Sequence, residues 1–181
     1  MAEILLISGS PTTSSKSAAL LEYSREWLRE KAPFETALVS VRDFPADDLI
    51  LAKYESPSFY VFKQQVSNAA GIVVSTPVYK AAYTGSLKAL LDILPQYAFR
   101  GKTILPIASG GSPGHLLAID YAIKPVLSTL GASDVLQGVY VVDQQFRIEN
   151  GQTIIAEEVR QRLDESLAQF VANLEIRAPV Q

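Results

Sequence analysis

The chain has 181 residues, 48% of them hydrophobic, which is enough to build one sizeable core. Its 16 basic and 19 acidic residues give a net charge of -3, which excludes a broad basic surface for nucleic acid or an anionic membrane and favours a small-molecule partner. With no cysteine and one histidine, the sequence excludes disulfides, thiolate metal ligands and cysteine nucleophiles, and it argues against a histidine-based metal site.

The beginning of the chain gives no sign of export. Met1-Ala2-Glu3 is followed by a short apolar run without the basic region of a signal peptide. No apolar stretch reaches the roughly 20 residues that span a bilayer. We therefore expect a cytoplasmic protein, and we expect one domain over residues 1–181 because no linker or internal repeat divides the chain.

Apolar runs of strand length alternate with segments of helical spacing. The expected strands are 4–7, 36–41, 72–75, 103–108 and 135–142, and the expected helices are 18–29, 60–70, 86–94, 116–130 and 154–174. Several strand runs are unbroken, which is typical of strands buried on both faces. The alternation predicts an α/β, three-layer flavodoxin-like fold, a five-stranded parallel sheet of order 2-1-3-4-5 with helices on both faces. Segment 43–58 is the least regular and is expected to be a surface connection.

In such a sheet the ligand lies beyond the carboxyl ends of the strands, so the loop after the first strand is a candidate site. Six hydroxyl residues crowd between Ser10 and Ser17 ahead of a helix. The segment matches neither the Walker pattern nor the dinucleotide fingerprint. Hydroxyls, free N–H groups and the positive end of the helix dipole favour a mononucleotide phosphate there, with Lys16 as the nearby cation. The alternative is that Ser15 or Ser17 simply caps the helix.

The loop after the third strand offers a ledge for a flat ligand. Pro77 fixes the backbone, and Tyr79 and Tyr83 lie four residues apart with small residues between them. A planar ring can lie against such a ledge. The alternative is an ordinary strand-to-helix loop with its tyrosines packed on the surface, and it applies with most force to Tyr83.

The fourth strand leads into a glycine-rich loop. Gly110, Gly111 and Gly114 let the backbone approach a ligand closely and leave N–H donors free. The alternative is a plain glycine-rich turn. His115, at the end of this loop, is the one histidine and invites a catalytic role, but a lone histidine in the first turn of a helix is more often structural. A Ser-His-Asp hydrolase is disfavoured because no Gly-x-Ser-x-Gly elbow follows a strand.

The expected helix 116–130 contains a proline. Pro125 cannot donate a hydrogen bond to the carbonyl of Tyr121, and its ring would crowd that carbonyl. The helix should therefore kink or bulge near Tyr121, and such bulges often mark a function or an interface. The alternative is a kink without consequence on the surface.

Three motifs together carry a family resemblance. They are Gly9-Ser10-Pro11, Thr76-Pro77-Val78-Tyr79-Lys80-Ala81-Ala82-Tyr83 with Gly85-x-Leu87-Lys88, and Gly110-Gly111 with His115-Leu116-Leu117-Ala118-x-Asp120-Tyr121-Ala122. From about residue 4 to about residue 143 the chain resembles the NAD(P)H-dependent FMN reductases of the sulfonate-utilisation type. The combination of the second and third motifs is more specific than the first motif. The residues after Asp143 contribute little to the resemblance.

The resemblance implies an enzyme that moves hydride from NADPH or NADH to flavin N5 and supplies reduced FMN to a partner flavin-dependent monooxygenase during sulfonate assimilation. It implies no metal and no acid or base residue. It also implies a homo-oligomer, a dimer or tetramer, packed through the helices that start near Gly85 and Leu116, with Tyr121 at the interface influencing flavin exchange. The implied phosphate contacts are Ser10, Thr12, Ser15 and Ser17, and the implied ring contacts are Pro77, Val78, Tyr79, Ser109, Gly110 and Gly111.

One position departs from the family pattern. Many relatives carry arginine where Thr12 stands, and that arginine helps to hold the flavin phosphate, so its absence implies weaker FMN binding here. Two other functions stay open. One is an FMN-retaining quinone or azo reductase. The other is a flavodoxin-like electron carrier without a nicotinamide site, which is disfavoured because such carriers usually present a strongly acidic docking surface. A receiver domain is excluded because Ser75-Thr76 stand where its aspartate would be.

Overall fold

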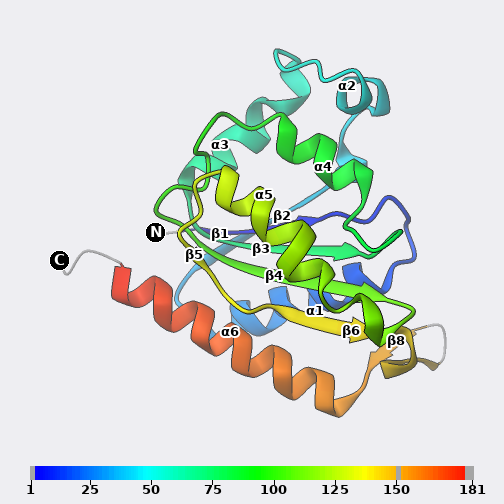
Figure 1. Ribbon diagram of the computed structural model, residues 1–181. Coiled ribbons are helices and arrows are strands. Elements are labelled where there is room, and N and C mark those ends of the chain that lie inside the picture. The colour runs from blue at the N-terminus through cyan, green and yellow to red at the C-terminus, as the bar shows by residue number, and fades with distance from the viewer. Residues whose placement is uncertain (1–2, 150–151, 178–181) are drawn as a thin grey trace.

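The computed structural model describes residues 3–149 and 152–177, and a twisted parallel sheet runs through its centre (Figure 1). Within the sheet β1 pairs with β2 and β3, and β4 pairs with β3, β5 and β6, all in parallel. The strand order β2-β1-β3-β4-β5 confirms the predicted α/β fold and its order. The strands are Glu3–Ser8 (β1), Glu35–Ser40 (β2), Ala69–Pro77 (β3), Thr103–Gly110 (β4), Asp134–Val135 (β5) and Val139–Val142 (β6).

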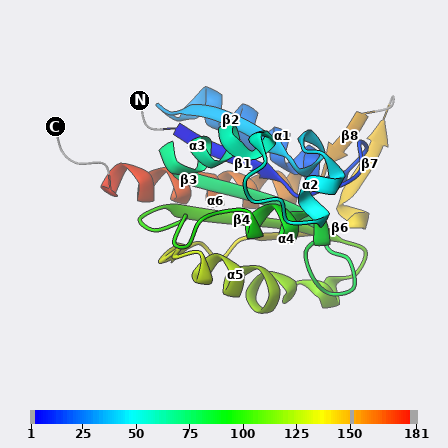
Figure 2. The ribbon, with the colours of Figure 1, turned by 90° about the horizontal axis from the view of Figure 1, so that it is seen from above.

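Helices cover both faces of the sheet, as Figures 1 and 2 show. Helices α1 (Lys16–Lys31) and α6 (Glu157–Arg177) lie on one face, and α3 (Tyr60–Asn68), α4 (Gly85–Asp92) and α5 (Lys124–Thr129) lie on the other. The short helix α2 (Ala46–Ile50) packs against α4. Two apolar cores separated by the sheet hold these layers together. Within residues 3–149 and 152–177, no helix has the length and apolar character needed to cross a bilayer.

The sequence of the central strands explains their place in the fold. All eight residues of β4 are buried, and so are most of those of β3. Their unbroken apolar runs suit strands that are covered by helices on both faces. Helix α1 begins where the Ser15 hydroxyl accepts a hydrogen bond from the N–H of Ala18, so the serine cap fixes the start of the helix beside the end of β1.

The predicted fifth strand is wrong in one respect, because residues 135–142 form two short strands rather than one. Gly138 separates β5 from β6 with a left-handed φ of +88°, which interrupts extended backbone. A Cβ at this position would lie 2.6 Å from the carbonyl oxygen of Pro106. Close approach to β4 therefore requires glycine, and the strand breaks at that residue.

The chain after Asp143 also differs from the prediction. A β-hairpin of Phe146–Glu149 (β7) and Gln152–Ile155 (β8) precedes α6. The last helix consequently begins at Glu157 rather than at residue 154, because Ile154 and Ile155 pair with β7. Segment 43–58, expected to be irregular, contains α2 and the start of a 3₁₀ turn at Pro57–Phe59.

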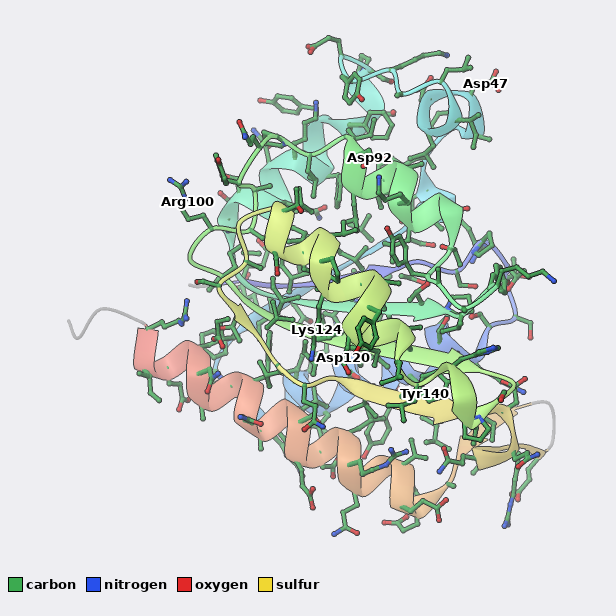
Figure 3. The ribbon with its side chains drawn as sticks, in the orientation of Figure 1. Asp47, Asp92, Arg100, Asp120, Lys124 and Tyr140 are labelled. Carbon is green, nitrogen blue, oxygen red and sulfur yellow. The ribbon has the colours of Figure 1, made fainter. Side chains whose placement is uncertain are left out.

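The helix after the glycine-rich loop is interrupted, as Pro125 predicts. Residues Ile119–Ile123 form a π-helical turn, and α5 continues from Lys124 with proline in its first turn. Tyr121 lies within the π turn and is 79% exposed. Asp120 and Lys124 form an ion pair at 2.6 Å along the same segment (Figure 3). The predicted bulge at Tyr121 is confirmed.

Candidate functional site

The carboxyl ends of β1, β3 and β4 lie side by side, and the loops that follow them contribute to the lining of a cavity of about 400 Å³. Ser8 lies opposite Ser75, and Pro77 lies opposite Ser109, so the three following loops start from one edge of the sheet. The volume falls within the range of small-ligand sites, and the position is where doubly wound sheets bind ligands. The lining residues are Thr12, Ser14, Ser15, Lys16, Pro77, Val78, Tyr79, Ser109, Gly110, Gly111, Asp143 and Phe146.

The first loop presents hydroxyls and helix N–H groups to this cavity. Thr12 and Ser15 line it, whereas Ser10 and Ser17 lie behind them at 1% and 0% exposure. The N–H of Thr12 donates to Ser10 Oγ at 3.3 Å, and the hydroxyls of Ser15 and Ser17 are 2.8 Å apart. Ser10 and Ser17 thus support the hydroxyls of Thr12, which is exposed, and of Ser15, which is half-buried. The N–H groups in the first turn of α1 have no carbonyl partner within the helix and suit an anion.

The second loop is held in a tight turn that fixes Tyr79. Tyr79 and Ala82 exchange two backbone hydrogen bonds of 2.8 and 3.1 Å. Between them Lys80 and Ala81 adopt left-handed φ values of +51° and +64°, a conformation that costs a non-glycine residue about 1–2 kcal/mol. Tyr79 lines the cavity and is 49% exposed. A strained turn therefore holds an aromatic ring at the edge of the cavity.

The other tyrosine of this loop has a different role. Tyr83 is half-buried, packs against the apolar core and does not line the cavity. Burial raises the pKa of its hydroxyl. The two tyrosines that the sequence places together are therefore separated in the structure, and only Tyr79 faces the candidate site.

The third loop packs against the second through backbone contact. The N–H of Val78 donates to the carbonyl of Ser109 at 2.7 Å. A Cβ on Gly110 would lie 2.6 Å from the hydroxyl of Tyr140 and 3.3 Å from Cβ of Val78, so this glycine is needed for close packing. At Gly111 the nearest atom would be 3.8 Å away, which leaves open space on the cavity side.

Tyr140 anchors the third loop from β6, where Figure 3 labels it. Its hydroxyl donates to the carbonyl oxygen of Ser112 at 2.7 Å, and its side chain is buried. Burial raises the pKa of this hydroxyl, and the charge of Asp143 raises it further, which keeps the hydroxyl protonated as a donor. Tyr140 thereby positions the Gly110–Gly111 backbone without lining the cavity.

Two lining residues lie beyond the motifs of the sequence. Asp143 directly follows β6, and Phe146 opens the hairpin strand β7. The Asp143 carboxylate is 3.1 Å from the ammonium of Lys16, which also lies 5.6 Å from the centre of the Phe146 ring. The place of Asp143 at the carboxyl end of a strand was the one available signal in the sequence.

His115 is half-buried in a 3₁₀ turn and does not line the cavity.

A second cavity, of about 480 Å³, lies between β6 and α6 and is lined by Pro113, Leu116, Gln137, Gly138, Val139, Tyr140, Val142, Gln145, Arg162, Glu165 and Ser166. It flanks the edge of the sheet rather than the ends of its central strands. It also lacks the hydroxyl-lined helix start of the first cavity. The cavity at the strand ends is therefore the better candidate for a nucleotide.

The doubly wound sheet and its hydroxyl-rich first loop define a flavodoxin-like, mononucleotide-binding protein. The NADPH-dependent FMN reductase family model matches residues 2–147. The chain belongs to this family, and it is accordingly an oxidoreductase that uses FMN and a nicotinamide nucleotide.

Individual relatives agree with this assignment. The chain is 47% identical to the FMN reductase (NADPH) of Pseudomonas putida, covering 92% of this chain and 85% of that protein. It is 43% identical to the FMN reductase (NADPH) of Escherichia coli, covering 92% and 87%. Among solved structures, an NADH:FMN oxidoreductase (EmoB) in its apo form has a TM-score of 0.86 at 35% identity, covering 96% of this chain and 90% of that chain.

The residues at the strand ends fit FMN. The Thr12 hydroxyl donates to the carbonyl of Ser14 at 3.2 Å, and the Ser15 hydroxyl accepts from the N–H of Ala18. With a phosphate at the start of α1, these hydroxyls and the remaining first-turn N–H groups would be neutral donors to it. Tyr79 supplies an aromatic face, and Gly111 leaves room beside the backbone of the third loop. The lining thus combines hydroxyls at the start of a helix with an aromatic side chain and glycine backbone, a set of groups that fits the phosphate and the ring of FMN.

Proposed function

We propose that this chain, as one domain over residues 1–181, reduces FMN with NADPH in the cytoplasm and releases reduced FMN to a separate flavin-dependent monooxygenase of sulfonate assimilation. The observation that supports release of reduced FMN is the composition of the proposed phosphate end of the cavity. It is built from hydroxyls and N–H groups, threonine stands at residue 12, and the cation Lys16 is paired with Asp143. Such a site binds a dianion less tightly than an arginine fork does.

Different residues of the cavity would bind the phosphate and the ring of FMN. The first turn of α1, with Thr12 and Ser15, would hold the phosphate, while Tyr79 and the backbone at Gly110 and Gly111 would seat the ring. Bound FMN supplies the hydride-accepting chemistry at N5. Tyr79 is half exposed, so the ring face beside it stays accessible to a nicotinamide. Hydride transfer depends on stacking and distance rather than on a general acid or base.

The choice of NADPH over NADH rests on the relatives. The two FMN reductases at 47% and 43% identity carry NADPH in their names. The solved NADH:FMN oxidoreductase is 35% identical, and two relatives at 27% and 31% identity are named NADH-dependent. The sulfonate role rests on the motif resemblance. Loss of the gene in its host should prevent growth on an alkanesulfonate as sole sulfur source while growth on sulfate continues, and unimpaired growth on the sulfonate would contradict this role.

The reaction is tested by following NADPH oxidation while FMN is increased, with reduced flavin collected anaerobically by ultrafiltration. Saturable turnover that depends on added FMN, with reduced FMN in the filtrate, is the expected result. Flavin that stays on the protein while quinones are reduced by ping-pong kinetics would favour the quinone or azo reductase. Flavin binding without NADPH oxidation would favour the electron carrier.

A matched pair of variants tests the location of the ring. Gly111→Phe places a bulky side chain in the cavity, because a Cβ there meets no atom closer than 3.8 Å. Turnover should be lost while the fold is kept. Gly114→Phe, at an exposed glycine outside the cavity where a Cβ would meet its nearest atom at 3.5 Å, should retain activity. Full activity in Gly111→Phe would refute the assignment of the third loop.

We also propose that the chain forms a dimer or tetramer through the helices that start near Gly85 and Leu116, with Tyr121 influencing flavin exchange. Leu116, Leu117 and Tyr121 are 52%, 53% and 79% exposed, and they cluster around the π turn. Exposed apolar residues in one region favour an interface. Tyr121→Ala should lower the mass measured by light scattering, whereas Tyr60→Ala, at a different exposed tyrosine, should not. An unchanged mass in Tyr121→Ala would overturn the proposed interface.

A further inference from the structure

Two charged side chains form an ion pair in the lining of the candidate cavity. Lys16 opens α1, and Asp143 directly follows β6. The Lys16 Nζ lies 3.1 Å from Oδ1 of Asp143 and 3.5 Å from its carbonyl oxygen. Among the described residues that line the cavity, these are the only two with charged side chains, so the lining has no formal net charge.

The position of this pair determines its effect on an incoming phosphate. Lys16 lies in the first turn of α1, where backbone N–H groups and the helix dipole attract an anion. Asp143 already supplies an anion to that ammonium. A phosphate that binds the first turn must therefore share or displace the carboxylate, and it meets a like charge beside it.

The pair is open enough to exchange partners. The side chains of Lys16 and Asp143 are 39% and 47% exposed, and ion pairs with this exposure are weak. The carboxylate can return to water when the ammonium turns to a phosphate. The pair consequently lowers the affinity for a phosphate without closing the site.

We propose that Asp143 is an internal competitor for Lys16 that sets a low affinity for the FMN phosphate and so promotes exchange of flavin. The inference rests on the proposed function, because it requires the flavin phosphate to bind at the start of α1. Asp143 is a specificity-determining residue under this proposal, since its effect depends on the phosphate that distinguishes FMN from riboflavin. A Cβ on Gly111, in the third loop, would lie 3.8 Å from Asp143 Oδ2, so an effect on the ring must be separated from an effect on the phosphate.

The test compares dissociation constants of FMN and riboflavin, measured by flavin fluorescence quenching at low ionic strength on flavin-free full-length protein. Asp143→Asn should tighten FMN binding by about threefold to tenfold, from the loss of one carboxylate near a dianion, and should leave riboflavin binding unchanged. Lys16→Gln should weaken FMN binding by a similar factor, again without changing riboflavin binding. In the Lys16→Gln background, Asp143→Asn should have a smaller effect.

A control variant removes an equal charge elsewhere on the same helix. Glu22 of α1 pairs with Arg25 at 3.3 Å and lies outside the cavity lining, so Glu22→Gln should leave both dissociation constants unchanged. An FMN affinity in Asp143→Asn equal to or weaker than that of the wild type would overturn the proposal. Equal tightening of FMN and riboflavin would also overturn it, because the carboxylate would then act on the ring. If the wild type bound neither flavin, the proposed function itself would fail.

Discussion

The contact between Gly110 and Tyr140 gives the sharpest structural prediction. A Cβ at Gly110 would lie 2.6 Å from the Tyr140 hydroxyl and 3.3 Å from Cβ of Val78. Because Tyr140 is buried and donates to Ser112 at 2.7 Å, its hydroxyl cannot move aside without losing that hydrogen bond. Gly110→Ala should therefore cost about 1–3 kcal/mol, the usual cost of overpacking.

The assay is reversible unfolding of matched alanine variants, followed by circular dichroism. For a chain of this size, the cost in Gly110→Ala corresponds to a fall in Tm of about 2–12 °C. Gly111→Ala, with 3.8 Å to its nearest atom, should stay within about 0.5 kcal/mol of the wild type. Equal stability of the two variants would refute the idea that Tyr140 and the third loop are tightly packed.

Three further substitutions test local interactions. Tyr140→Phe should lose about 1 kcal/mol of unfolding free energy by removing the donor to Ser112, and an unchanged denaturation midpoint would contradict that anchoring role. Burial, and to a smaller extent the hydrogen bond that the Tyr23 hydroxyl donates to Asp164, raise the pKa of Tyr23 to about 12. The ordinary value is about 10. The protonated Tyr23 hydroxyl contributes its full stabilisation below about pH 10, and this contribution is lost as pH rises through about 12. The free energy of unfolding of the wild type should therefore fall more steeply over this pH range than that of Tyr23→Phe. Equal pH dependence of the two proteins would contradict this prediction. Ala81→Gly should leave the free energy of unfolding unchanged or raise it by up to about 1 kcal/mol, because φ is +64° at this position. A clearly lower free energy of unfolding, measured by urea denaturation, would show that the turn is not strained.

Much of the site could be predicted because chain position alone places loops at one edge of a parallel sheet. Eight of the ten expected contact residues line the cavity, and the exceptions Ser10 and Ser17 lie just behind it. A residue pattern cannot distinguish a hydroxyl that faces a cavity from one that supports it, since both occur in the same hydroxyl-rich turn. Whether these residues contact FMN stays a prediction.

Other features depended on contacts between segments distant in sequence. The break at Gly138 follows from the proximity of Pro106, which no local pattern records. Phe146 reaches the cavity because a hairpin, unrecognised in the sequence, brings the chain back beside α1. Asp143 reaches the cavity from the end of β6, whose pairing with β4 sets its place. In contrast, the bulge near Tyr121 was predictable, because the cause is the proline four residues later and acts locally.

The location of FMN in a crystal structure of its complex would test the central claim most directly. We expect the phosphate against the first turn of α1 near Ser15, and the ring between Tyr79 and the backbone at Gly111. Flavin bound instead in the cavity between β6 and α6, near Arg162, would contradict the assignment of the site and the competition proposed for Asp143.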